Sequence, residues 1–152
     1  MKKTIVLFAL IIITGTAFSQ SLSSLKTDFH QELSTQLKSA ETQAMAMAKD
    51  TSKKNEDKLK NVESILKNLE VAKTSHQSIK KSTPVKQKAT TQKSHESIEK
   101  HHLLATKYAT SLKEELSKQK PDSATVQTYT KKLTHELSSL NLEHQSLKTI
   151  LK

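Results

Sequence analysis

Histidine is the residue type whose spacing in this chain points most directly to chemistry. The 152-residue sequence holds seven histidines and no cysteine, so zinc sites built on paired cysteines and thiol catalysis are excluded. Three similar stretches each run from a histidine to an aliphatic residue three positions later: His76-Gln77-Ser78-Ile79, His95-Glu96-Ser97-Ile98 and His144-Gln145-Ser146-Leu147. Residues three apart share one face of a helix, so each imidazole is expected beside that aliphatic side chain.

Four histidines fall where the apolar pattern around them would place leucine or isoleucine: His76, His95, His102 and His144. His30 lies beside the pattern. In helices that run alternately up and down, residues at equal distances from a turn lie at the same height. His30, His76, His95 and His144, one from each predicted helix, are therefore expected within about two helical turns of one another at one end of the molecule. His102 lies about two turns farther along its helix from His95.

This placement predicts a metal site. Imidazole nitrogens that converge from separate helices suit Zn²⁺, Cu²⁺, Ni²⁺ or Co²⁺. The predicted ligands are His30, His76, His95 and His144, with His102 as a further candidate. A carboxylate ligand or an acceptor for an imidazole N–H could come from Glu32, Glu96 or Glu143.

Two other roles for the same histidines stay open. Buried polar residues fix the register between helices, and these imidazoles could be hydrogen-bonded to neighbouring serine and glutamine side chains. Clustered imidazoles would also repel one another when protonated, which would make this end of the molecule sensitive to pH. His101 and His135 are predicted to point away from the apolar stripes, so they are natural controls.

The elements that must position these histidines are helices. From residue 21 onward apolar side chains recur at alternating spacings of three and four, which is typical of one buried stripe on each helix. Four such stripes predict an all-α fold, an antiparallel up-down-up-down four-helix bundle with coiled-coil-like seams. The alternative is a pair of long helical hairpins that complete their core by dimerising. The expected helices cover residues 21–50, 53–82, 85–120 and 122–151, and one domain spans 20–152.

Proline and glycine mark the limits of these helices. The one glycine is Gly15, and a chain without further glycine cannot form a P-loop or a dinucleotide-binding turn. Pro84 is predicted as the first residue of the third helix with Thr83 as its cap, and Asp122 or Ser123 is predicted to cap the fourth.

The first 19 residues resemble a cleavable export signal. Lys2 and Lys3 precede an apolar stretch over residues 5–13, and Ala17 and Ser19 provide the small residues at −3 and −1 of a cleavage site before Gln20. The apolar stretch is shorter than the roughly 20 residues that span a bilayer. We therefore expect a mature chain in a bacterial periplasm or outside the cell, with no membrane span after cleavage.

The charge excludes some partners and leaves others open. The formal net charge is +10 and every basic residue is lysine, so the arginine forks typical of base and phosphate recognition are absent. Specific nucleic-acid binding is therefore not expected. Two roles for the charge stay open: solubility alone, or a weak attraction to acidic envelope components. Adjacent carboxylates, Glu56-Asp57 and Glu114-Glu115, are predicted on solvated helix faces, and no other pattern favours an enzyme.

The predicted function is a binding or structural role in the cell envelope, carried out by an exported, non-enzymatic helical bundle. The alternative function is binding or buffering of a transition metal by the histidine cluster. The chain is expected as a monomer or a homodimer.

Overall fold

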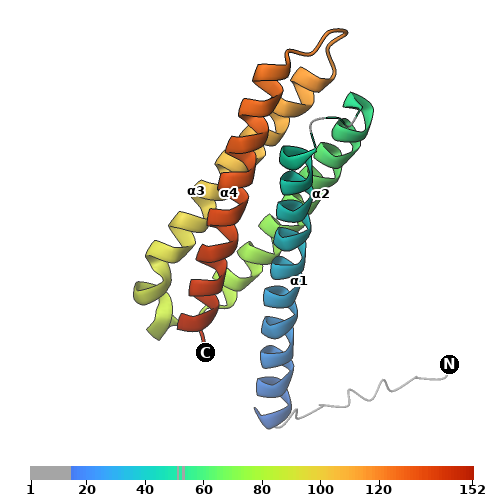
Figure 1. Cartoon of the computed structure of the whole chain (residues 1–152). Helices are drawn as coiled ribbons and strands as arrows, with labels where there is room; N and C mark the ends of the chain where they lie inside the picture. Colours follow the sequence, from blue (N-terminus) through green and yellow to red (C-terminus); the bar gives the residue numbers. More distant parts are fainter. Residues whose placement is uncertain (1–14, 51, 53) are drawn as a thin grey trace, which may run out of the picture.

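The chain forms four helices in a computed structural model that describes the backbone of residues 15–50, 52 and 54–152. Side chains are described from residue 28 onward, residues 51 and 53 excepted. The helices are α1 (Gly15–Lys49), α2 (Asn55–Ser82), α3 (Val85–Leu116) and α4 (Ser123–Ile150), and no strand occurs in the described part of the chain (Figure 1).

The helices pack as two hairpins, α1–α2 and α3–α4, with the closest packing inside each hairpin. The hairpins meet where α1 lies against α4 and α2 lies against α3. The diagonal pairs, α1 with α3 and α2 with α4, make no close backbone approach over the described residues. This order of neighbours is that of a four-helix bundle, so the predicted fold class is confirmed.

Hydrogen bonds across the helix interfaces define the direction of each helix. Between α1 and α2, residue numbers fall along one helix as they rise along the other, in the bonds Glu32 to Ser75, Ser39 to Asn68 and Gln43 to Ser64. Across α2 and α3, Glu63 pairs with Lys113 and Lys80 pairs with Glu99. Neighbouring helices in these interfaces therefore run antiparallel.

The core consists of the predicted stripes. Among the side chains that the structure describes, twenty apolar ones are buried, including Leu37, Ile65, Leu112 and Leu137, each 0% exposed. All four helices of a single chain contribute to this core, so its completion does not require a second copy. Over the described residues, none of the helices carries an apolar stretch long enough to cross a membrane.

The helix ends differ from the prediction at several positions. The first helix begins at Gly15 and not at residue 21, the second begins at Asn55 and not at residue 53, and Pro84 is the cap of the third helix and not its first residue. The third helix ends at Leu116 and not at residue 120, because the Glu115 carboxylate accepts hydrogen bonds from Lys118 Nζ (2.5 Å) and from the Asp122 backbone N–H (2.9 Å), which turns the chain. Thr83 does not cap the third helix. Its hydroxyl donates to the Ile79 carbonyl at 2.9 Å, and so closes the end of α2.

The predicted cap of the fourth helix is confirmed. The Asp122 carboxylate accepts from the Thr125 backbone N–H at 2.8 Å, which satisfies one of the free donors of the first turn. The prediction of an export signal over residues 1–19 falls mainly on residues 1–14, outside the described part of the chain, and α1 begins at Gly15.

Candidate functional site

His30 and His144 form the first of two imidazole pairs. Nδ1 of His30 lies 3.1 Å from Nε2 of His144, and the rings are stacked with their centroids 5.4 Å apart. His144 is 1% exposed, and its Nδ1 has no hydrogen-bond partner among the residues that the structure describes. Because Nδ1 lacks an acceptor, we place the proton of neutral His144 on Nε2, from which it donates to His30.

His76 and His95 form the second pair, deeper in the bundle. Nε2 of His76 lies 2.9 Å from Nδ1 of His95, and each residue is 3% exposed. Nε2 of His95 lies 3.4 Å from the Thr83 hydroxyl, whose own proton is donated to the Ile79 carbonyl. The hydroxyl therefore accepts from His95 Nε2–H, which leaves His95 Nδ1 to accept the proton of His76.

Each pair joins one hairpin to the other. His30 and His144 bridge α1 and α4, whereas His76 and His95 bridge α2 and α3. In both pairs the two residues come from neighbouring, antiparallel helices, as the sequence predicts. The imidazoles thus replace apolar contacts at both interfaces between the hairpins.

The four predicted ligands do not form one shared centre. In the part of the chain that the structure describes, no three His, Cys, Asp or Glu side chains lie together so that they could hold a metal ion. His102 is separate from both pairs, because its Nε2 lies 2.7 Å from the Leu69 carbonyl. Of the carboxylates proposed as further ligands, Glu32 accepts from Ser75 at 2.6 Å and Glu96 accepts from Gln92.

The environment of the pairs disfavours protonation. Burial, followed by the proximity of His95, lowers the pKa of His76 to about 4. Burial, followed by the proximity of His30 and then of Lys148, lowers the pKa of His144 to about 4. Burial and Lys80 also lower the pKa of His95, against the opposing charge of Glu99. His76, His95 and His144 are therefore neutral at pH 7.

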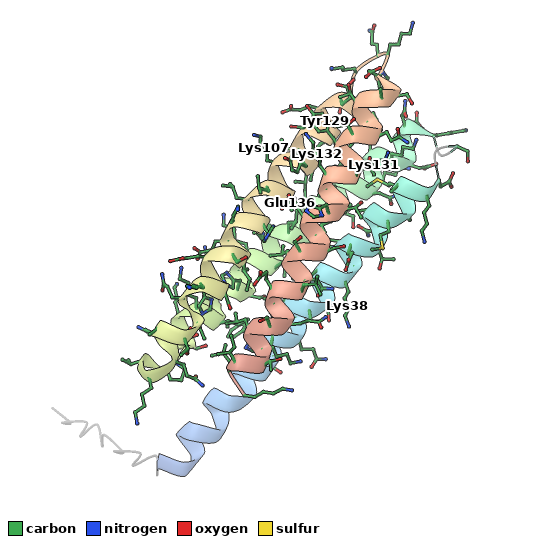
Figure 2. The ribbon with its side chains drawn as sticks, turned by 60° about the vertical axis from the view of Figure 1, so that its left-hand side comes forward. Lys38, Lys107, Tyr129, Lys131, Lys132 and Glu136 are labelled. Carbon is green, nitrogen blue, oxygen red and sulfur yellow. The ribbon has the colours of Figure 1, made fainter. Side chains whose placement is uncertain are left out.

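His101 is not the surface control that its position in the sequence predicts. Its Nδ1 lies 2.7 Å from Oε2 of Glu136, and the two side chains are 22% and 11% exposed. Glu136 lies on α4, on the side that faces α3 (Figure 2). His135 is exposed, and so remains a suitable control.

The sequence does not predict the burial of two carboxylates, Glu115 and Glu136. Glu115 is buried and turns the chain after α3, although the adjacent pair Glu114-Glu115 is predicted on a solvated face; Glu114 is exposed as expected. Glu136 directly precedes the core residue Leu137, and its role depends on His101 from another helix. One signal was available for Glu136, since it lies three residues after Leu133 at the edge of the apolar stripe.

An open pocket of about 660 Å³ lies at the end of the bundle where α2 passes into α3. Its walls come from α1, from the end of α2 with the start of α3, and from the end of α4. His30, a member of the first pair, and Thr83, whose hydroxyl contacts His95 of the second pair, both line it. Three lysines, Lys38, Lys148 and Lys152, also line it, and no Asp or Glu side chain is among its described lining residues.

No protein-family model, curated protein or solved structure matches this chain.

Proposed function

We propose that this chain is an exported, non-enzymatic helical bundle with a binding or structural role in the envelope of a bacterial cell. The observation that carries the proposal is the lysine-lined pocket at one end of the bundle. A pocket of this volume is within the usual range for small-molecule sites, and its side-chain charge matches the acidic components expected in an envelope.

The arrangement of titratable groups supports a role without catalysis. His76 and His95 bond to each other, and His101 bonds to Glu136, so these groups are occupied within the bundle. Glu115 is held by Lys118 and the Asp122 backbone. A general acid or base must reach a substrate atom within about 3 Å, and these buried pairs offer no such approach.

Fractionation of cells that express the full chain tests the export part of the proposal. We expect the protein in the periplasm or the medium, with an intact mass that corresponds to a chain beginning at Gln20. The matched control replaces Ala17 and Ser19 by bulky residues, which is expected to block cleavage. Uncut protein in the cytoplasm of the unmodified strain would contradict the proposal.

Binding of a transition metal is the second candidate function, and the two imidazole pairs favour it. Two Zn–N bonds of about 2.0 Å at a tetrahedral angle separate the nitrogens by about 3.3 Å. The observed separations are 2.9 Å and 3.1 Å, so a small outward shift of either pair would admit a metal ion. For each pair to hold a metal, the donor histidine would carry its proton on Nδ1 in place of Nε2, so that both facing nitrogens offer lone pairs. Each pair would then be a separate two-histidine site completed by water.

Calorimetric titration with Zn²⁺, Cu²⁺, Ni²⁺ and Co²⁺ tests this second function. His95→Ala is expected to remove one binding event and His144→Ala the other, whereas His135→Ala leaves both. The metal content of protein purified without a polyhistidine tag provides an independent measurement. Equal weak binding by all four proteins would exclude the histidine pairs as metal ligands.

A further inference from the structure

We infer that the pocket at the end of the bundle binds an anionic amphiphile, a molecule with one acidic head and a short apolar tail. The inference rests on the proposed binding role and names the class of ligand. It follows from three properties of the pocket: its positive rim, its apolar floor and its position beside the histidine pairs.

The rim of the pocket is cationic. Lys38 projects from α1 and Lys148 from the last turn of α4, and both side chains are exposed. The described lining residues include no carboxylate side chain that would neutralise them. Lysine is a compact point charge on a flexible stem, so it can follow a carboxylate or a phosphate head without imposing a fixed geometry.

The floor of the pocket is apolar. Ile79 is 2% exposed and belongs to the core, and Leu151 is partly buried and packs against the same core. Both residues line the pocket between the polar side chains of the rim. A small inorganic anion would leave the accessible part of Leu151 uncovered, whereas an alkyl tail would remove it from water.

The positive charge of Lys148, on the rim, acts on the pair formed by His30 and His144. Lys148 lies close enough to His144 to contribute to the lowering of its pKa. His30, the partner of His144, is itself part of the pocket wall. An acidic head held at the rim would therefore lie near His30, and its binding is expected to change the imidazole signals of that residue.

Calorimetry with decyl phosphate, below the concentration at which it forms micelles, tests the inference on the mature chain. Decyl phosphate is expected to bind at least about tenfold more tightly than either inorganic phosphate or decanol, because only it engages both rim and floor. Lys148→Gln and Lys38→Gln are each expected to weaken its binding by roughly fivefold or more. The matched control is Lys107→Gln, at an exposed lysine on α3 well away from Lys38 (Figure 2).

Nuclear magnetic resonance gives the position of the ligand. Decyl phosphate is expected to shift the imidazole signals of His30 and to leave those of exposed His135 unchanged. No binding of decyl phosphate, or equal weakening by Lys107→Gln and Lys148→Gln, would overturn the inference.

Vesicles of phosphatidylglycerol, compared with phosphatidylcholine, separate a free amphiphile from a membrane surface as its source. One outcome would overturn ligand binding in the pocket and leave the envelope role intact. In that outcome the chain binds the anionic vesicles but not decyl phosphate, and Lys148→Gln does not weaken the binding to vesicles. Retention of the chain in the cytoplasm would contradict the proposed function without affecting the pocket.

Discussion

Acid is expected to destabilise the bundle between about pH 6.5 and 4, because His76, His95 and His144 are buried in uncharged form at the junction of the hairpins. The unfolded chain exposes these imidazoles, so there they titrate near the ordinary value of 6.5. Folding lowers the pKa of His76 and of His144 to about 4. Below pH 6.5 the unfolded state therefore binds more protons than the native state, and stability falls as the pH falls.

The pKa values set the size of this effect. Each differs by about 2.5 units between the two states, and one unit corresponds to about 1.4 kcal/mol, so each histidine contributes roughly 3 kcal/mol. This stability is fully present above pH 6.5 and is lost by about pH 4. A combined loss of about 6 kcal/mol is comparable with the whole stability of a typical domain, about 5 to 15 kcal/mol.

Urea unfolding followed by circular dichroism at several pH values between about 7.5 and 4.5 measures the loss. Replacement of one complete pair, in the double variant His76→Leu/His95→Leu, is expected to remove at least half of the pH dependence, because leucine fits the apolar stripe and cannot titrate. The control His135→Ala keeps the full dependence. The carboxyls with lowered pKa values, Glu99, Glu115 and Asp122, add to the loss only near the acid end of this range, where they begin to protonate in the unfolded chain.

A free energy of unfolding that changes by less than about 1 kcal/mol across this range would refute the reasoning. The same conclusion would follow if the double variant lost stability on acidification as steeply as the unmodified protein.

Three further substitutions test the packing. Leu137→Ala removes a side chain that is 0% exposed and is expected to cost about 2 to 5 kcal/mol in urea unfolding; a cost below about 1 kcal/mol would contradict its place in the core. Asp122→Ala removes the cap of α4 and is expected to cost about 1 kcal/mol, seen as a lower melting temperature that Asp122→Asn largely restores. His101→Ala leaves the buried Glu136 carboxylate without its imidazole partner and is expected to cost about 2 kcal/mol, whereas His135→Ala costs nothing measurable.

The sequence was sufficient to predict the four helices and their core. Apolar spacing of three and four fixed the stripes, and Pro84 and Pro121 marked two of the connections. The predicted end of α3 is four residues too late. The Glu115 carboxylate turns the chain through contacts with Lys118 and Asp122, and the spacing of apolar residues carries no information on such contacts.

The sequence predicts the end of the bundle at which the histidines lie, but not which imidazoles contact one another. The stripes identify His76, His95, His102 and His144 as core positions. Three of the four are buried, whereas His102 is only partly buried. Whether four imidazoles share a centre depends on the directions of their side chains and on the offset between helices. These features place His30 against His144 and His76 against His95, and leave His102 on the Leu69 carbonyl.

Site-resolved titration of the imidazoles by nuclear magnetic resonance tests most directly whether two histidine pairs, with His76 and His144 neutral, connect the hairpins. We expect His76 and His144 to stay neutral, with the proton on Nε2, until the pH falls to about 4. Magnetisation transfer is expected between His30 and His144, and between His76 and His95. Titration of both His76 and His144 near pH 6.5, with no transfer within either pair, would contradict this arrangement.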